Sequence, residues 1–402
     1  MVVILESMAR LPHVALLIET SRSYGREVLR GVRRYMSEQG PWSVYLETRA
    51  LESEAPAWLR GWKGDGILVR TGTAALARQV RATSVPVVEL RSRRFNPRAP
   101  WVGVDNRALG ETVAEHLLDR GFRTFGLLAL DTEDFFRERC ANFVATLRRR
   151  GLPCVVLQAP PRAEHPARWE AQQRELVGWV RRLPKPAGIM ACTDQLGFWL
   201  LDACARAGIP VPEEIAVVGV ENDEALCLMA RPPLSSVALN TERIGYEAAG
   251  MLDRLMRGRA LRNPVVHVEP LGIVARQSSD VVAVEDPRLA RALRHIREHA
   301  CEGIGVGDVL LAASLSRSTL ERGLRRLLGR SPHDELGRVR LERARRLLVE
   351  TDLKLAAVAH RAGFRHVQHF CAVFKKAFGR TPGRYRRRRT SPSGGGTHDP
   401  GG

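Results

Sequence analysis

The sequence has no uncharged apolar run long enough to span a bilayer. Its first twenty residues make a poor signal peptide, because they contain Glu6 and Pro12 and no small-residue cleavage site follows. The seven cysteines form no C-x-x-C pair and no zinc-binding spacing, and their odd number argues against a disulfide framework. We therefore expect a cytoplasmic protein with reduced cysteines, no bound metal and no cofactor.

Acidic residues are outnumbered by basic ones, and the resulting positive charge is unevenly distributed. The 402 residues include 63 Lys and Arg against 44 Asp and Glu, a formal net charge of +19. Residues 285–389 contain 25 of these basic and 11 of these acidic residues, so about a quarter of the chain carries +14. Such a concentrated field favours a polyanionic partner, although charge alone also fits a solvated basic surface. The length predicts two or three domains.

Short apolar runs alternate with longer segments of helical spacing between about His13 and Ser278. The runs are HVALLIET, WSVYLET, GDGILVR, PVVEL, WVGV, FGLLAL, CVVLQ, GIMACT, IAVVGVE and SSVALN. Strands separated by helices predict parallel sheets built from right-handed βαβ units, a pattern that doubly wound enzymes share. We expect an α/β domain over residues 11–280.

Ligands of such sheets bind at the carboxyl ends of the strands, where this chain has polar residues but no dedicated nucleophile. The predicted ligand-binding residues are Ser21, Arg22, Tyr24, Asp105, Arg137, Arg139, Thr193, Asp194, Glu221, Asn222 and Asp223, and Asn106 lies beside Asp105. Carboxylates accept hydrogen bonds from hydroxyl groups and arginine donates a planar fork, so this mixture suits a neutral polyol. Asn, Asp, Ser and Thr after a strand also fit helix caps.

Longer stretches of this region resemble the LacI/GalR-type effector domain, a two-lobed relative of periplasmic sugar-binding proteins. The resemblance covers residues 11–279 and rests on VGVDNRALGETVAEHLLDRGFRTFGLL, RERCANF, GIMACTDQLGFWLLDACARAGIPVPEEIAVVGVENDE and PPLSSVALNTERIGYEAAGMLDRLM. It implies two α/β lobes that are joined by three crossovers, close around a sugar and pair into a dimer. By motif position it implies sugar contacts from Asp105, Arg139, Thr193, Asp194 and the GVEND turn.

The chain departs from that family in two ways. Glu221 stands where the family usually has an aspartate. The helix-turn-helix with which the family begins is missing, because the first expected strand starts near His13. Any DNA-binding element must therefore lie elsewhere in the chain.

The last quarter contains an internal repeat with an offset of fifty residues. GRSP at 329–332 recurs as GRTP at 379–382, and Leu320, Leu324 and Leu328 correspond to Phe370, Phe374 and Phe378. The spacing predicts helices over 308–313 and 318–328 in the first copy and over 355–362 and 366–378 in the second, with a connecting helix over 334–351. The i, i+4, i+8 rows predict core faces.

Two helix-turn-helix units held apart by a rigid helix fit consecutive turns of the DNA major groove. The residues expected at DNA are Arg317, Ser318, Glu321, Arg322, Arg325, His366, Val367, Gln368, Cys371, Lys375 and Lys376. Arg322 can bond bidentately to guanine and Gln368 to adenine. Phosphate contacts are expected from Arg325, Arg326, Lys375, Lys376 and the arginines of 384–389.

The stretch LAAVAHRAGFRHVQHFCAVFKKAFGRTPGRYR resembles the AraC/XylS-type DNA-binding domain. The resemblance covers residues 286–388 and implies a double helix-turn-helix domain, which we place at 286–389. Ala372 stands where relatives can present a long basic side chain, so base contacts from the second unit are expected to be weaker. Residues 390–402 are rich in Gly, Ser and Pro and are expected to be disordered.

Together the two resemblances imply a sugar-responsive transcription regulator. We expect it to be an activator that binds direct-repeat promoter half-sites as a homodimer, engages RNA polymerase, and responds to a pentose, with D-xylose the first candidate. Arg22, Arg26, Arg137 and Arg139 leave another sugar or a sugar phosphate open. A further alternative is an amidotransferase-like enzyme with Cys192 as nucleophile, but neither a histidine nor a glycine-flanked elbow accompanies that cysteine.

Overall fold

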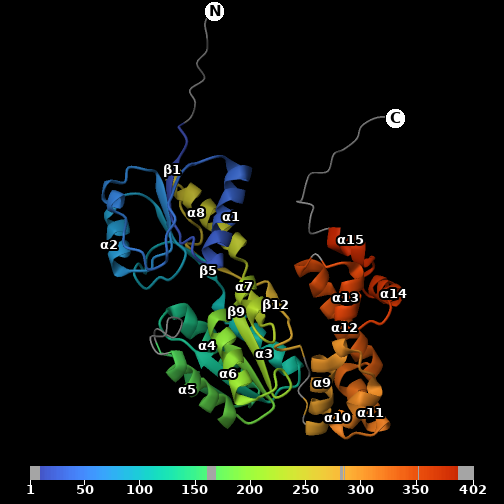
Figure 1. The fold of residues 1–402 in the computed structure, drawn as a ribbon. Coiled ribbons are helices and arrows are strands. Elements are labelled where there is room, and N and C mark those ends of the chain that lie inside the picture. Colours follow the sequence, from blue (N-terminus) through green and yellow to red (C-terminus); the bar gives the residue numbers. More distant parts are fainter. Residues whose placement is uncertain (1–9, 161–168, 281–283, 285, 352, 388–402) are drawn as a thin grey trace, which may run out of the picture. The chain divides into compact units, whose positions relative to one another are not determined.

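The computed structural model describes residues 10–160, 169–280, 284, 286–351 and 353–387. It divides the chain into two compact units, Met1–Val281 and Val282–Gly402. The first unit contains two six-stranded sheets flanked by helices, and the second is helical (Figure 1). The predicted fold class, a two-lobed α/β domain followed by an all-α domain, is confirmed. The tail expected to be disordered, residues 390–402, lies outside the described residues.

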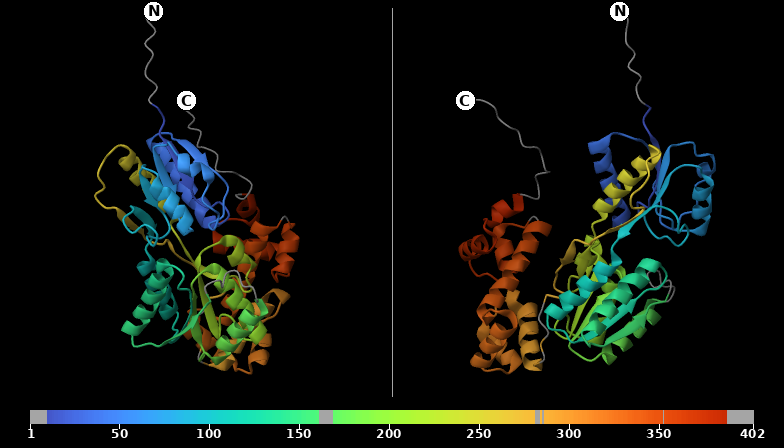
Figure 2. Two further views of the ribbon diagram at one scale, coloured as in Figure 1. Left: turned by 90° about the vertical axis from the view of Figure 1, so that its left-hand side faces the viewer. Right: turned by 180° about the vertical axis from the view of Figure 1, so that it is seen from behind.

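The first lobe is a parallel sheet with the strand order β11-β5-β4-β3-β1-β2. Its strands are β1 (His13–Leu17), β2 (Ser43–Leu46), β3 (Gly66–Val69), β4 (Val87–Glu89), β5 (Trp101–Val104) and β11 (Val265–Val268). Its helices are α1 (Ser23–Gln39), α2 (Ala74–Ala82) and α8 (Thr241–Met256), with a 3₁₀ turn at Ala57–Gly61. Helices α1 and α8 lie side by side, because Gly31 lets the carbonyl oxygen of Glu242 approach where a Cβ atom would stand (Figure 2).

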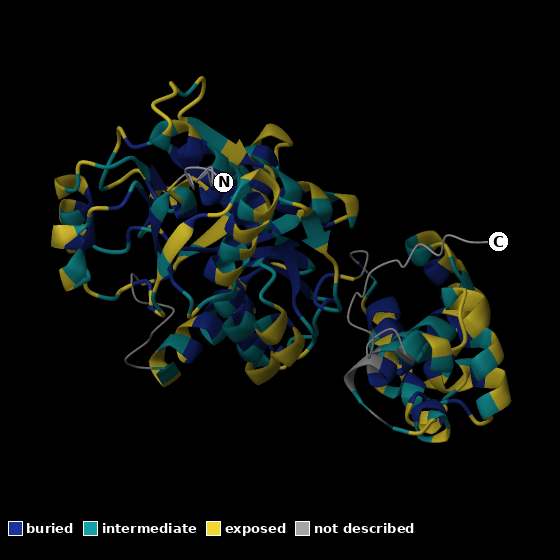
Figure 3. Cartoon of the chain, turned by 90° about the horizontal axis from the view of Figure 1, so that it is seen from above, coloured by how far each residue is buried: buried dark blue, intermediate teal, exposed yellow. Residues whose placement is uncertain are grey.

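The second lobe repeats this plan with the strand order β12-β10-β9-β8-β6-β7, in which β12 runs antiparallel to its neighbour and the other pairs of described strands are parallel. Its strands are β6 (Thr124–Ala129), β7 (Cys154–Gln158), β8 (Ala187–Ala191), β9 (Ile215–Glu221), β10 (Ser235–Ala238) and β12 (Gly272–Val274). Its helices are α3 (Asn106–Asp119), α4 (Asp134–Arg149), α5 (Trp169–Arg182), α6 (Asp194–Ala207) and α7 (Glu224–Met229). The central strands are buried on both faces, as expected for sheets covered by helices (Figure 3).

The chain passes between the two lobes three times. It crosses from β5 to α3 at Asp105, returns from β10 to α8, and crosses again from β11 to β12. The strands expected from the apolar runs are all present, whereas β11 and β12 were not among them. The carboxyl ends of the parallel strands in each lobe gather at one edge of its sheet, which is where a site for a ligand is expected.

The helical unit contains the two predicted helix-turn-helix units. Its helices are α9 (Pro287–His299), α10 (Val306–Ala313), α11 (Arg317–Leu328), α12 (Pro332–Glu350), α13 (Leu355–Arg361), α14 (Val367–Phe378) and α15 (Pro382–Arg387). Leu320, Leu324, Phe370 and Phe374 are fully buried, which confirms the core rows of the repeat. Their third members, Leu328 and Phe378, are half-buried.

Local signals explain where these helices begin and end. Gly329 and Gly379, fifty residues apart, both adopt the left-handed conformation that ends α11 and α14. Ser331 and Asp334 form a capping box at the start of α12, so this helix begins at Pro332, two residues earlier than the spacing predicted. Leu336, Leu347 and Leu348 of α12 are buried against the unit.

Candidate functional sites

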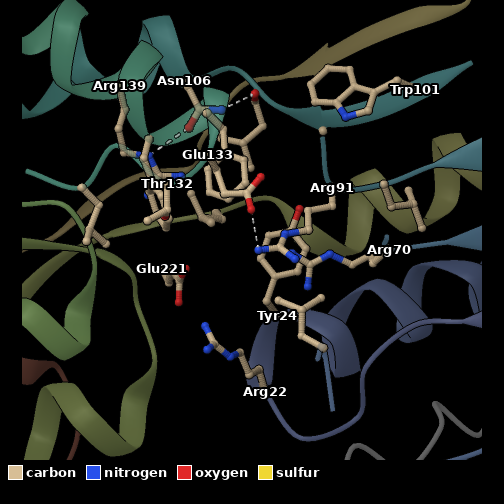
Figure 4. Close-up of a pocket in the computed structure, with 18 of the residues that line it drawn as sticks. Arg22, Tyr24, Arg70, Arg91, Trp101, Asn106, Thr132, Glu133, Arg139 and Glu221 are labelled. Carbon is tan, nitrogen blue, oxygen red and sulfur yellow. Dashed lines mark hydrogen bonds and ion pairs between the residues drawn. The ribbon is translucent and has the colours of Figure 1, made fainter. Parts of the chain in front are cut away.

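A cavity of about 490 Å³ lies between the two lobes of the first unit (Figure 4). It is lined by Arg22, Tyr24, Leu51, Glu52, Arg70, Leu90, Arg91, Trp101, Gly103, Val104, Asn106, Leu130, Thr132, Glu133, Phe135, Phe136, Arg139, Glu221 and Leu239. Most of these residues follow the carboxyl end of a strand, so both sheets present polar side chains to the same space. The cavity therefore has the position that parallel-sheet topology predicts for a ligand site.

On the side of the first lobe, the wall of the cavity is built around Arg70. Its guanidinium carbon lies 4.1 Å from the centre of the Tyr24 ring, and its head group pairs with the buried carboxylate of Glu19. Burial, and then the charge of Arg91, lower the pKa of Arg70 to about 9, so it remains charged at neutral pH. Burial also raises the pKa of Tyr24, which keeps its hydroxyl a hydrogen-bond donor.

An ion pair connects the two lobes across the cavity. Arg91, which follows β4, places Nη2 3.0 Å from Oε1 of Glu133, the N-cap residue of α4 (Figure 4). Both side chains are largely buried, with 13% and 10% of their surface exposed. Three more buried atoms in this region, Arg91 Nε, Glu133 Oε2 and Trp101 Nε1, have no hydrogen-bond partner among the described residues. A bound molecule with several hydroxyl groups would satisfy such atoms.

Two further hydrogen bonds join the lobes beside the ion pair. Ser23 Oγ donates to Oδ2 of Asp223 over 2.8 Å. Arg94 Nη1 donates to the carbonyl oxygen of Thr132 over 3.2 Å. These two hydrogen bonds and the ion pair hold the described lobes in contact.

On the side of the second lobe, the floor is organised by Arg139, which is 3% exposed. Its Nε donates to Oδ1 of Asn106 and its Nη1 to the carbonyl oxygen of Cys192, each over 3.0 Å. The rings of Phe135 and Phe136 flank its guanidinium at 5.6 and 5.3 Å. This arrangement combines a fixed donor with apolar ring faces, a pairing that suits the hydroxyls and C–H faces of a sugar.

The structure brings four of the predicted ligand-binding residues to the cavity wall, namely Arg22, Tyr24, Arg139 and Glu221. The remaining seven, Ser21, Asp105, Arg137, Thr193, Asp194, Asn222 and Asp223, are outside its lining. Asp105, Thr193 and Asp223 accept backbone hydrogen bonds as the N-caps of α3, α6 and α7. Ser21 is exposed, and Arg137 is exposed and pairs with Asp134.

Asp194 and Asn222 hold the second lobe together behind the cavity. The Asp194 carboxylate accepts hydrogen bonds from Ser236 Oγ at 2.5 Å and from the backbone of Asp223 at 2.7 Å. Burial raises the pKa of Asp194 to about 7, and the nearby Glu221 adds to the shift. Asn222 Oδ1 accepts a hydrogen bond from Arg276 over 2.7 Å.

Residue types after the strands could have revealed the cavity residues that sequence reasoning missed. Arg70 and Arg91 each come directly after an apolar run, GILV and PVVEL respectively. Glu133 and the two phenylalanines stand in the segment between the run FGLLAL and Arg137, close to residues that were selected. Trp101 opens a strand rather than closing one, so the rule that points to strand ends does not find it.

Among the described residues, Cys192 does not fit the role of nucleophile that the amidotransferase-like alternative requires. Cys192 is fully buried, its Sγ lies 3.7 Å from Sγ of Cys140, and burial raises its pKa well above the usual value. A reactive cysteine needs an accessible thiolate, so Cys192 lacks both properties of a nucleophile. Within the described part of the chain, no group of three or more His, Cys, Asp or Glu side chains could hold a metal ion.

In the helical unit, α11 and α14 expose one face each. Arg317, Ser318, Arg322, Arg325, His366, Gln368, Lys375 and Lys376 are exposed, and Glu321 is half-buried. Val367 and Cys371 are different, because both are half-buried and pack against the core of the second helix-turn-helix unit. In the parts of the chain that are described, no helix is long and apolar enough to cross a membrane.

Family models match both units. A XylR N-terminal domain model matches residues 13–107, a periplasmic binding protein-like domain model matches residues 114–279, and a helix-turn-helix domain model matches residues 311–388.

Relatives with known roles match nearly the whole chain. The xylose operon regulatory protein of Escherichia coli (strain K12) is 32% identical over 386 residues, which cover 93% of this chain and 96% of that protein. The protein of the same name from Haemophilus influenzae is 30% identical over 381 residues, which cover 93% of this chain and 97% of that protein.

Solved structures agree with this result. A structure described as the xylose-binding transcription activator xylR has a TM-score of 0.79 at 30% identity and covers 94% of this chain and 99% of its own. The transcriptional regulator CelR in complex with cellobiose is 22% identical, with a TM-score of 0.54 over 67% of this chain and 85% of its own, and shares the fold of the first unit.

Proposed function

Because the chain belongs to the family of xylose operon regulatory proteins and is therefore a DNA-binding transcription regulator, we propose that it senses a pentose, with D-xylose the first candidate. The pentose binds in the cavity between the two lobes, and its binding changes the affinity of the helical unit for promoter DNA. The relatives named above carry xylose in their names, which supports the choice of sugar.

The observation that carries the sugar proposal is the polar but balanced lining of the cavity. The charged residues of the lining are Arg22, Arg70, Arg91, Arg139, Glu52, Glu133 and Glu221, and Glu19 pairs with Arg70. Once Glu19 is counted, guanidinium groups and carboxylates are equal in number, so the site offers donors and acceptors to hydroxyl groups without a net charge for a phosphate. The unpartnered atoms of Arg91, Glu133 and Trp101 give a polyol three further hydrogen bonds. We assign sugar contacts to Arg22, Tyr24, Arg91, Glu133, Arg139 and Glu221.

On the DNA side, Arg322 and Gln368 contact base edges in successive major grooves. Their exposure on α11 and α14, one in each helix-turn-helix unit, supports this assignment. Arg325, Lys375 and Lys376 hold phosphates, which add affinity without sequence information. The protein acts in the cytoplasm as a homodimeric activator. It binds direct-repeat half-sites in promoter DNA and contacts RNA polymerase at the promoter. It has no catalytic role.

The proposal is tested by the melting temperature of the full chain with D-xylose, L-arabinose, D-ribose, D-glucose and D-xylose 5-phosphate. A ligand at a hundredfold excess over its Kd stabilises the native state by about 2.7 kcal/mol, which raises the melting temperature measurably. We expect D-xylose to give the largest shift. If the phosphate ester gives a larger shift than D-xylose, the choice of a neutral sugar is wrong, and if no pentose gives a shift, the proposal fails.

A further inference from the structure

Helix α3 begins at the cavity. Its first residue, Asn106, is 2% exposed, lines the cavity and accepts a hydrogen bond from Arg139, the donor at the floor of the cavity. Asp105, directly before it, is the point where the chain crosses from the first lobe into the second. Any change in the position of Arg139, or in the angle between the lobes, therefore acts on the first turn of α3.

The last turn of α3 holds the segment through which the chain leaves the first unit. Nε of Arg120, the C-cap residue directly after α3, donates to the carbonyl oxygen of Ser279 over 2.8 Å, and the ring of His116 lies 2.9 Å from the Ser279 hydroxyl. Arg120 Nη1 also contacts Nδ1 of His116 at 3.0 Å. We call these three residues, His116, Arg120 and Ser279, the clasp. Ser279 is fully buried, and the described chain of this unit ends one residue later, at Asp280.

The protonation state of the clasp follows from its contacts. A guanidinium can only donate, so Nδ1 of His116 must accept from Arg120, and Nε2 then carries the proton and donates to Ser279. Burial, followed by the charge of Arg120, lowers the pKa of His116 to about 3, which keeps the ring neutral. The contact between His116 and Ser279 is thus a directional hydrogen bond and not an ion pair, and the charge of Asp280 acts on both His116 and Arg120.

The two serines at the exit have different partners. Ser278 is bonded to the sheet, because its hydroxyl donates to the carbonyl oxygen of Val217 and its carbonyl accepts from the Val217 amide. The hydroxyl and carbonyl of Ser279 point instead to α3. In the exit segment, which comprises Ser278, Ser279 and Asp280, Ser278 is therefore bonded to the sheet and the next residue, Ser279, to the helix that starts at the cavity.

Helix α3 is suited to transmit a displacement between its ends. It has 14 residues, about 21 Å at the rise of an α-helix. It is locked to α4, since a Cβ atom on Gly110 would stand 2.5 Å from the carbonyl oxygen of Arg139 itself. A shift of Arg139 thus reaches α3 by a side-chain hydrogen bond and by backbone contact.

We propose that α3 couples the cavity to the DNA-binding unit, with His116 and Arg120 as positioning residues that act through Ser279 on the segment leading to that unit. This inference rests on the proposed function and adds how sugar binding is communicated. Sugar binding shifts α3, the clasp moves the exit segment with it, and the orientation or freedom of the DNA-binding unit changes. A ligand can shift such an equilibrium only by its differential affinity, so breaking the clasp removes the coupling and leaves each binding reaction intact.

The test measures coupling in both directions on the full chain. DNA affinity is measured by fluorescence anisotropy, with and without saturating D-xylose, on a fragment selected from a random pool by the parent protein. D-xylose affinity is measured by calorimetry with and without that DNA, and linkage requires the same factor from both. The parent should show a factor of roughly 5 to 150, the usual range of allosteric coupling. In Arg120→Ala the factor should fall to within about twofold of one, while D-xylose still binds.

Four other variants separate coupling from folding. Ser279→Ala removes a single hydroxyl and should reduce the factor in part, even if Arg120→Ala unfolds the lobe. His116→Gln keeps a donor near the position of Nε2 and should retain most of the coupling that His116→Leu loses. Arg107→Ala is the matched control, because Arg107 lies on the same helix, is 71% exposed and pairs with Glu111.

The outcomes distinguish the clasp from the proposed function. Full coupling in both Arg120→Ala and Ser279→Ala overturns the clasp and leaves the sugar proposal standing. Loss of D-xylose affinity in Ser279→Ala by more than about tenfold also overturns it, because the clasp then acts on binding and not on communication. A parent protein that binds D-xylose without any effect on DNA affinity overturns both.

Discussion

Glu133→Gln tests the cavity most directly, because this variant keeps the shape of the side chain and removes only its charge. Glu133 is the N-cap residue of α4, where the helix dipole favours a carboxylate. One of its oxygens accepts from Arg91 across the lobes, and the other is buried and unpartnered. The substitution therefore weakens both an interlobe contact and a proposed sugar contact.

The expected loss can be estimated from these two bonds. A hydrogen bond to a charged group contributes about 1.5–3 kcal/mol and a neutral one about 0.5–1.5 kcal/mol, so each bond loses on the order of 1 kcal/mol when the carboxylate becomes an amide. The Arg91–Glu133 pair is largely buried, so solvent screens it little. We expect D-xylose to bind about 1–3 kcal/mol more weakly, roughly a 5- to 150-fold increase in Kd.

Calorimetric titration of D-xylose into parent and variant measures this loss at one temperature and pH. Glu138→Gln is the control, because Glu138 lies on the same helix and is exposed, so its Kd should match that of the parent. Melting temperatures without sugar show whether Glu133→Gln is folded. A Kd within about twofold of the parent in a folded variant would remove Glu133 from the sugar site.

Two further predictions concern the rest of the chain. The folded pKa of Asp194, about 7, lies above its unfolded value near 4, so the folded state holds the extra proton between these pH values and stability falls as the pH rises through them. The melting temperature of Asp194→Asn should therefore fall less from pH 5 to pH 8 than that of the parent. An equal fall in both proteins would contradict the raised pKa of Asp194. Arg322→Ala should weaken binding to the selected DNA by about 1–3 kcal/mol and relax specificity at one base pair. Lys376→Ala should weaken binding to selected and random DNA alike and reduce the salt dependence of DNA affinity. Fluorescence anisotropy measures both effects. Equal losses on both DNAs for Arg322→Ala would argue against base contact.

The fold could be predicted because its signals are local and periodic. Alternating apolar runs gave the strands, and the fifty-residue repeat placed α14 at 366–378, against the observed Val367–Phe378. Strands β11 and β12 were missed, since the segment containing them has no continuous apolar run: His267 interrupts one and β12 has only three residues. They matter, because β12 joins the second sheet and completes the third crossing between the lobes.

The lining of the cavity could be predicted only in part. Arg22, Tyr24, Arg139 and Glu221 were selected and line the cavity, while Asp105, Thr193 and Asp223 were selected by the same rule and cap helices. The two groups look alike in sequence, because a polar residue after a strand serves either purpose. Which purpose applies depends on the direction of its side chain, and that is set by contacts with residues far away in the chain.

The sequence by itself determined the two classes of domain, the duplicated helix-turn-helix and the basic character of the second unit, since each follows from spacing or charge that neighbouring residues carry. The tertiary structure alone decided that Arg91 meets Glu133 across the lobes, and that α3 runs from Asn106 in the cavity to the clasp on Ser279. These contacts join residues 42, 33 and 159 positions apart. Only the packing of the folded sheets and helices brings such residues within hydrogen-bond distance, and no local pattern records it.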